Sequence, residues 1–179
     1  MTPAESALNI PTRSGPTRIG LISDTHGLLR EEALLALRGS ELIVHAGDVG
    51  DPKILQKLKE LAPVVAVRGN VDTGLWSLSL PETAVAQASS ASIYVLHDVK
   101  ALALDPAAAG FQIVVSGHSH KPGRSETKGV LYINPGSAGP RRFRLLISVA
   151  RLNLRVHPWV LEFVDLEKGG RVGEQRAWR

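Results

Sequence analysis

Seven side chains that can bind metal ions follow short apolar runs along the first two thirds of the chain. They are two aspartates, one asparagine and four histidines: Asp24, His26, Asp48, Asn70, His97, His118 and His120. Carboxylate, amide and imidazole groups are common ligands of divalent cations. Since seven ligands exceed the four of a tetrahedral zinc site, the set predicts two metal ions that share a bridging carboxylate.

Cysteine is absent from the 179 residues. Its absence excludes a disulfide scaffold, a thiolate zinc site, an iron–sulfur cluster and a cysteine nucleophile. Any metal site must therefore use oxygen and imidazole ligands. Two of the six histidines do not follow an apolar run: His45 lies inside one, and His157 precedes a proline. We predict structural roles for both.

The elements that must position these side chains alternate between strands and helices in the first half of the chain. Apolar runs predict strands at residues 18–23, 41–46 and 63–67. Helices are predicted at residues 28–37 and from Pro52, after the N-cap Asp51, to residue 61. This order implies parallel strands, whose carboxyl ends meet at one edge of a sheet. The metal-binding side chains are therefore expected to form one cluster.

The second half of the chain favours strands. Residues 80–96 contain two strand-like runs, the second being Ser92–Leu96, and residues 105–110 resemble a short helix before a strand at 111–116. Further strands, joined by short connections, are predicted at residues 124–128, 130–134, 144–150, 152–157 and 160–165. The chain is thus expected to form a single domain over residues 18–167, with a flexible N-terminal arm (1–17) and a flexible C-terminal tail (168–179).

The ordered motifs resemble those of the calcineurin-like metallophosphoesterase superfamily. They are Asp24-x-His26, Gly47-Asp48, Gly69-Asn70, His97 and Gly117-His118-x-His120. Residues 67–72 and the run Asn134-Pro135-Gly136-Ser137 are similar to the small YfcE-like phosphodiesterase branch. The resemblance implies a mixed α/β fold, a four-layer α-β-β-α sandwich, with a dinuclear metal site at one edge.

The resemblance also implies how the ligands divide. One metal would be held by Asp24, His26 and His120, and the other by Asn70, His97 and His118, with Asp48 as the bridge. Mn²⁺ is the metal implied first, and Fe²⁺, Co²⁺, Ni²⁺ or Zn²⁺ also suit these ligands. Two cations lower the pKa of a water from 15.7 toward about 7, which supplies hydroxide for an in-line attack on a phosphodiester.

The catalytic residues expected from this mechanism are Asp48, Asn70 and His97, together with Asp72. Many superfamily members have a histidine where this chain has Val71, which cannot donate a proton to the leaving group. Asp72 is the nearest ionisable substitute, and a turn role is the alternative for it.

A second departure stands at Asp98-Val99, where many members of the branch have glycine and histidine. Asp98 is expected to orient His97 or a metal-bound water, to repel an anionic substrate, or to serve only in the loop; the residues leave these alternatives open. Candidates for substrate contacts are Arg68, Ser137 and Arg141, although Arg141 and Arg142 also read as a solvated basic pair.

The leading hypothesis is a metal-dependent phosphodiesterase acting on a small substrate. The alternatives are a phosphomonoesterase or nucleotide pyrophosphatase with the same site, and a non-catalytic interaction scaffold similar to the eukaryotic retromer subunit of this family. Nucleic acid is not favoured as a partner, because only 4% of residues are aromatic and no stacking platform is evident. The sequence lacks a secretory signal pattern and a membrane-spanning apolar run, so a cytoplasmic location is expected. Similar proteins are often homo-oligomers.

Overall fold

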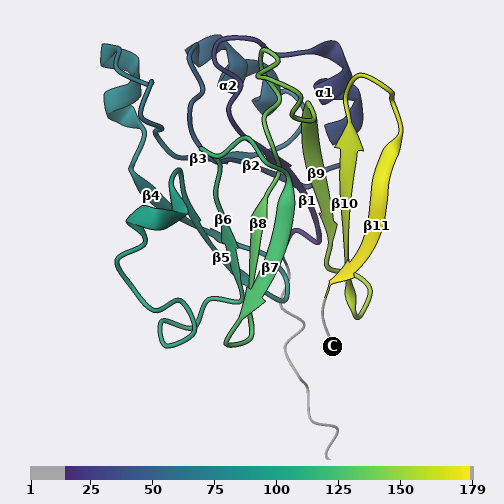
Figure 1. Cartoon of the computed structure of the whole chain (residues 1–179). Helices are drawn as coiled ribbons and strands as arrows, with labels where there is room; N and C mark the ends of the chain where they lie inside the picture. The colour runs from purple at the N-terminus through teal and green to yellow at the C-terminus, as the bar shows by residue number, and fades with distance from the viewer. Residues whose placement is uncertain (1–14, 178–179) are drawn as a thin grey trace, which may run out of the picture.

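Two β-sheets pack face to face in the computed structural model, which describes residues 15–177 (Figure 1). The strands of the first half are β1 (Arg18–Ile22), β2 (Leu42–His45), β3 (Val64–Ala66), β4 (Thr83–Gln87) and β5 (Ser92–Leu96). Those of the second half are β6 (Ile113–Val115), β7 (Gly123–Thr127), β8 (Val130–Asn134), β9 (Ser148–Asn153), β10 (Trp159–Asp165) and β11 (Arg171–Ala177). Over the described residues, one sheet has the order β11-β10-β9-β1-β2-β3 and the other β4-β5-β6-β8-β7.

Parallel strands form one half of the six-stranded sheet and the centre of the five-stranded sheet. In the first sheet β1, β2 and β3 run parallel, and in the second β5, β6 and β8 do. Apolar side chains from both sheets, such as Leu21, Val44, Ile93 and Val115, are fully buried between them. Burying one such side chain stabilises the fold by about 1.5–3 kcal/mol, so this interior fixes how the two sheets face each other.

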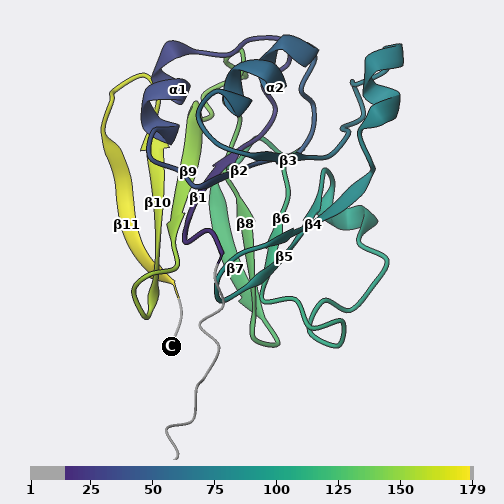
Figure 2. The same ribbon diagram turned by 180° about the vertical axis from the view of Figure 1, so that it is seen from behind.

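Two α-helices, α1 (Glu31–Leu37) and α2 (Pro52–Lys59), cover the outer face of the six-stranded sheet (Figure 2). Leu37 and Leu58 are fully buried there. Helix α2 begins as predicted, since the Asp51 carboxylate accepts the Lys53 N–H and Pro52 occupies the first turn. Helix α1 is shorter than predicted at its start, because Arg30 still has an extended backbone.

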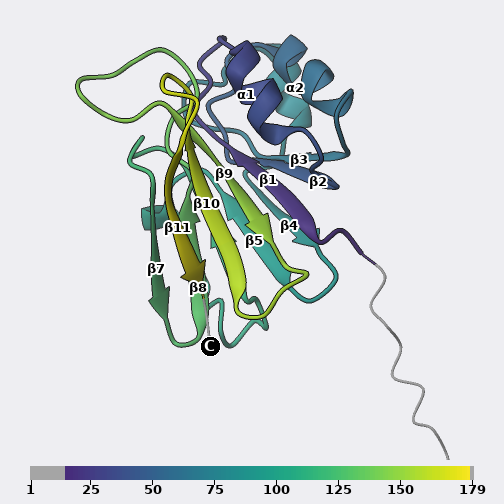
Figure 3. The ribbon, with the colours of Figure 1, turned by 90° about the vertical axis from the view of Figure 1, so that its right-hand side faces the viewer.

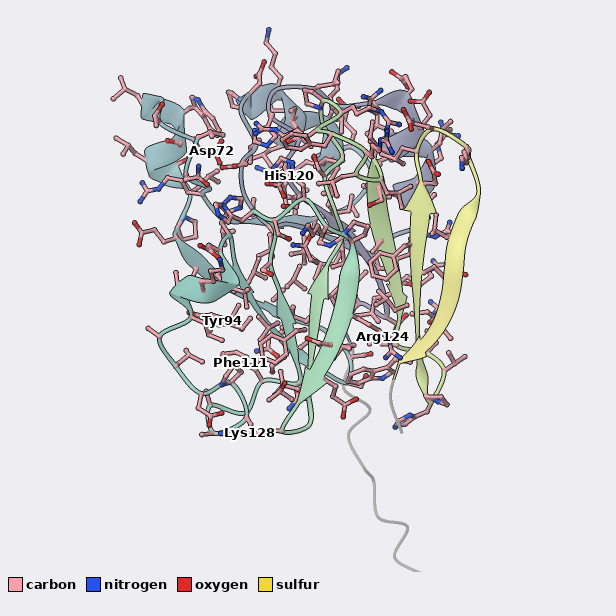
Figure 4. The ribbon with its side chains drawn as sticks, viewed as in Figure 1. Asp72, Tyr94, Phe111, His120, Arg124 and Lys128 are labelled. Atoms are coloured by element: carbon pink, nitrogen blue, oxygen red, sulfur yellow. The ribbon has the colours of Figure 1, made fainter. Side chains whose placement is uncertain are left out.

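The fourth layer lies on the outer face of the other sheet and is thin. Leu102 follows the 3₁₀ helix η2 (Val99–Ala101) and packs with Ala107 against Tyr94, Val114 and Tyr132. Phe111 also lies against Tyr94, with ring centroids 5.1 Å apart (Figure 4). The helix predicted at residues 105–110 is a run of turns. It stops after a single turn, because Gly110 takes a left-handed backbone with φ of 83°.

Two predictions for the C-terminal part were wrong. The strands expected at residues 144–150 and 152–157 are the single strand β9, because both runs pair continuously with β1 and β10. Most of the expected flexible tail forms β11, which pairs with the free edge of β10 after a turn at Gly169 and Gly170 (Figure 3). Backbone pairing at this edge outweighs the polar composition on which the prediction rested.

The expected N-terminal arm falls mostly outside the described residues, which begin at residue 15. Thr17 is anchored, since its N–H and hydroxyl donate to the Glu41 carboxylate at 2.7 and 2.8 Å. None of the helices within residues 15–177 has both the length and the apolarity needed to span a bilayer.

Candidate metal centre

The candidate ligands lie in loops that directly follow the parallel strands. Five of the seven have a left-handed backbone, with φ of 53° at Asp24, 48° at His26, 54° at Asp48, 67° at His118 and 59° at His120. This conformation costs a non-glycine residue about 1–2 kcal/mol and gathers at functional sites. Hydrogen bonds between the loops hold it, because Asp24 N–H donates to Gly47 and His26 N–H donates to Asp48.

Asp24, His26 and His120 form the first group of ligands. His120 Nε2 lies 3.2 Å from Asp24 Oδ1 and 3.2 Å from His26 Nε2. The Ser23 hydroxyl and the His118 N–H donate to the Asp24 carboxylate and hold it in this orientation. His120 lies at the end of the two sheets where the loops meet (Figure 4). Residues 94 positions apart along the chain therefore face one another.

Asn70, His97 and His118 form the second group. Asn70 Oδ1 lies 3.1 Å from His97 Nε2 and 3.1 Å from His118 Nδ1. The other ring nitrogen of His97, Nδ1, donates to the Ala46 carbonyl at 2.7 Å. This bond leaves the Nε2 lone pair directed into the site, as metal-binding histidines require.

Asp48 stands between the two groups. Its Oδ2 lies 3.9 Å from His26 Nε2 and 3.2 Å from His97 Nε2, and its Oδ1 accepts the Val71 N–H at 3.0 Å. The same carboxylate oxygen thus faces ligands of both groups, which is the arrangement that a bridging ligand needs. The structure brings all seven candidate ligands together.

The chemistry of this cluster fits metal ions. Ligand atoms of Asp24, His26 and His120, and of Asp24, Asp48 and His97, lie within 4.8 Å of one another. Burial raises the pKa of Asp24 to about 6, and it lowers the pKa of His120 to about 4, which leaves the imidazole neutral with a lone pair available. The neutral His120 imidazole gives the buried Asp24 carboxylate no compensating charge, and a divalent cation would supply it.

Glycines beside the ligands are required by close packing. A Cβ atom on Gly69 would lie 2.1 Å from Asp48 Oδ1, and one on Gly117 would lie 1.9 Å from Ser23 Oγ. Real Cβ atoms do not approach so closely, so any side chain at either position would displace a ligand or its support. The glycines therefore set how near the loops approach one another.

Asp72, expected as a catalytic residue, holds two loops together in the structure. Its buried carboxylate accepts N–H groups of Val49 at 3.1 Å, Gly50 at 2.8 Å and Gly69 at 2.8 Å. These bonds tie the loop after β2 to the loop after β3, and hence Asp48 to Asn70. The contacts favour the turn role that the sequence had left open.

The three expected substrate residues are engaged with protein groups. Arg68 pairs with Glu82 at 2.7 Å, the buried Ser137 hydroxyl donates to the Asp24 carbonyl at 2.9 Å, and Arg141 pairs with Glu167. Arg142, which the sequence does not single out as a site residue, acts on the first ligand group through its charge. After burial, its positive charge is a further cause that lowers the pKa of His26 and of His120.

Asp98 lies beside His118. Its Oδ1 accepts the Lys100 N–H at 3.0 Å and its Oδ2 lies 3.8 Å from His118 Nε2. The carboxylate thus adds a negative charge at the border of the second ligand group. Sequence spacing alone suggested a partner for the adjacent His97 and did not single out His118.

Beneath the site, His45 is expected to make stability depend on pH. It is fully buried, with Nε2 3.0 Å from Thr25 Oγ1, and burial lowers its pKa to about 4. Between pH 6.5 and 4 the unfolded chain binds a proton that the folded chain does not, so stability is lost as pH falls. Between pH 7 and 4, the unfolding free energy of the metal-free wild type should fall by up to about 3 kcal/mol more than that of His45→Gln.

Urea unfolding at several pH values measures this difference. His157→Gln removes an exposed histidine and should keep the pH dependence of the wild type. Equal pH dependence of wild type and His45→Gln would contradict the assignment.

The comparisons with known proteins agree with this geometry. The family model described as calcineurin-like phosphoesterase superfamily domain matches residues 17–156. A probable metallophosphoesterase of Methanocaldococcus jannaschii is 36% identical over 136 residues, 69% of each chain. The structure of Yfce, a phosphoesterase from E. coli, matches with a TM-score of 0.67 at 23% identity, over 89% of this chain and 98% of the other.

Vps29 of Entamoeba histolytica, in complex with Zn²⁺, matches with a TM-score of 0.69 at 23% identity, again over 89% of this chain and 98% of the other. At such identities the two structures show a shared fold. They confirm the predicted α/β architecture with two packed sheets.

Proposed function

Since the chain belongs to the calcineurin-like phosphoesterase superfamily, we propose that it is a phosphodiesterase that uses two divalent metal ions, with Mn²⁺ as the first choice. The observation that carries the proposal is the position of Asp48 Oδ2 between the two ligand groups. A cytoplasmic location and a homo-oligomeric state are part of the same proposal.

The roles of the ligands follow from their positions. Asp24, His26 and His120 would hold one cation and Asn70, His97 and His118 the other, with Asp48 shared. When bound, such cations stabilise charge on the phosphoryl oxygens and acidify a water molecule. Because His97 Nδ1–H is held by the Ala46 carbonyl, its Nε2 lone pair stays directed at the site.

The surroundings of the site favour a diester over a monoester. At the second ligand group, Asp98 places a negative charge 3.8 Å from His118 Nε2 and Arg68 is paired with Glu82, whereas the charge of Arg142 acts on the first group. A phosphodiester carries one negative charge and a monoester up to two, so the monoester is repelled more strongly. Val71 offers no proton, which favours substrates with good leaving groups.

A non-catalytic interaction scaffold is the second candidate function, because several large apolar side chains are exposed. Leu75 and Leu78 of η1 (Leu75–Ser79) are 88% and 69% exposed, and Phe143 is 91% exposed. Large apolar side chains at the surface often mark protein contacts. The similarity of fold to Vps29 is consistent with this candidate.

Calorimetry and a substrate panel test the proposal. Metal-free protein should bind two Mn²⁺ per chain and then hydrolyse bis(p-nitrophenyl) phosphate at least about tenfold faster than p-nitrophenyl phosphate, a difference in barrier of about 1.4 kcal/mol. Faster turnover of the monoester or of a nucleoside triphosphate would favour the monoesterase or the pyrophosphatase. Absence of both Mn²⁺ binding and turnover would favour the scaffold.

A further inference from the structure

Two cavities adjoin the second ligand group on either side of Asp98 and His118. One, of about 630 Å³, also reaches Asn70 and His97, and the other, of about 600 Å³, lies on the outer face of the five-stranded sheet. Both include Asp98 and His118 in their walls, and the His118 side chain is 46% exposed. A substrate bound at the metal centre can therefore extend an arm into each.

The cavity next to Asn70 suits a neutral arm. Its arginine, Arg68, is paired with Glu82 at 2.7 Å, and Leu78, Leu96 and Ala101 supply apolar walls. Apart from this pair, its charged residues are Asp98 and the buried Asp72. An arm carrying a second negative charge would meet no unpaired cation there.

The cavity on the outer face is rich in hydrogen-bond donors. Lys100 and Lys121 contribute its ammonium groups, and Ser119, Ser125 and Tyr132 contribute hydroxyls. Among residues 15–177, neither lysine takes part in a salt bridge. The cavity has one carboxylate, that of Asp98, and this group accepts the backbone N–H of Lys100. Such a set suits an anion, because ammonium and hydroxyl groups donate to phosphate oxygens.

Arg124 does not contribute its charge to this cavity. It pairs in register with Ile133, whose side chain is buried between the sheets, whereas Ser125 pairs with Tyr132 on the outer face. The Arg124 side chain accordingly points away from the outer face, toward β11 (Figure 4). The positive charge of the cavity thus comes from Lys100 and Lys121.

We propose that the cavity beside Lys100 and Lys121 binds a second phosphate carried by one arm of the substrate. This inference rests on the proposed phosphodiesterase function and names its substrate class. The substrate is a small diester with unlike arms: a neutral arm beside Arg68 and Glu82, and a phosphate-bearing arm beside the lysines.

Two chromogenic substrates that differ by one phosphate test the proposal. Thymidine 5′-(p-nitrophenyl phosphate) is compared with its 3′-phosphorylated form, both releasing p-nitrophenolate. The 3′-phosphate should form partly exposed ion pairs with Lys100 and Lys121. These two pairs should raise kcat/KM about tenfold for the 3′-phosphate form, mainly through a lower KM. In Lys100→Gln/Lys121→Gln the ratio between the two substrates should fall to about two or less.

Lys53→Gln/Lys57→Gln is the matched control. It removes the same charge from the exposed side of α2 and should keep the wild-type ratio, which separates local binding from overall charge. An equal preference for both substrates in the wild type, or a preference that survives in Lys100→Gln/Lys121→Gln, would overturn the inference.

A binding measurement separates failure of this inference from failure of the proposed function. Analogues in which a methylene group replaces the ester oxygen next to the nitrophenyl ring keep the negative charge and cannot release p-nitrophenolate, and their Kd values come from calorimetry with Mn²⁺ present. If neither ester is hydrolysed, the phosphodiesterase proposal fails. A tenfold tighter Kd for the 3′-phosphate analogue, lost in Lys100→Gln/Lys121→Gln, would still support the subsite, and equal Kd values would reject it.

Discussion

Asp48→Asn is expected to lower hydrolysis of a phosphodiester by at least about 10³-fold, because it removes the charge of the ligand that both metal groups share. Asp48 Oδ2 faces His26 and His97, and an amide there offers either a neutral oxygen or an N–H that repels a cation. Calorimetry should show weaker binding of Mn²⁺, with at least one site lost. Stability of the metal-free protein should change little, since the amide oxygen can still accept the Val71 N–H.

Asp51→Asn is the control for this variant. Asp51 lies three residues further along and caps α2, a role that asparagine fills as well as aspartate. Its activity and metal binding should match the wild type. Retention of full activity by Asp48→Asn, with two Mn²⁺ still bound, would contradict the bridging role and with it the dinuclear mechanism.

Asp72→Ala is expected to cost about 3 kcal/mol or more of unfolding free energy, because it leaves three N–H groups without their acceptor. For a chain of this size the loss corresponds to about 10 °C in Tm. The Val49 and Gly69 amides that lose their partner belong to loops that carry Asp48 and Asn70. Metal affinity should therefore fall together with stability.

Two further variants separate this role from proton donation. Asp72→Asn keeps one acceptor oxygen, so its stability should lie between those of Asp72→Ala and the wild type. Asp105→Ala removes an exposed carboxylate that also accepts backbone N–H groups and pairs with Lys128, and it should lower the unfolding free energy far less than Asp72→Ala does. If Asp72→Asn kept the wild-type Tm but lost the basic limb of the pH–rate profile, Asp72 would be a general acid.

Much of the fold follows from local patterns. Apolar runs located most of the strands, and Asp51-Pro52 located the start of α2, because both signals depend on residues only a few positions apart. The strand β11 was missed for the opposite reason. Its stability comes from pairing with β10, and the residues around Gly169 and Gly170 do not by themselves indicate that pairing.

The sequence by itself determined which chemical groups this protein places after its parallel strands: oxygen and imidazole ligands, without thiolates, beside glycines. Those features are local, since residue type and position at a strand end do not depend on distant parts of the chain. Only the tertiary structure decided which groups meet.

The tertiary structure placed Asp48 Oδ2 between the two ligand groups and directed the Asp72 carboxylate toward three backbone N–H groups. It also paired Arg141 with Glu167. The pair of Arg141 and Glu167 joins residues 26 positions apart, and the contacts between His118 and Asp24 span 94 positions. Such contacts depend on how two sheets pack, which no short stretch of residues encodes.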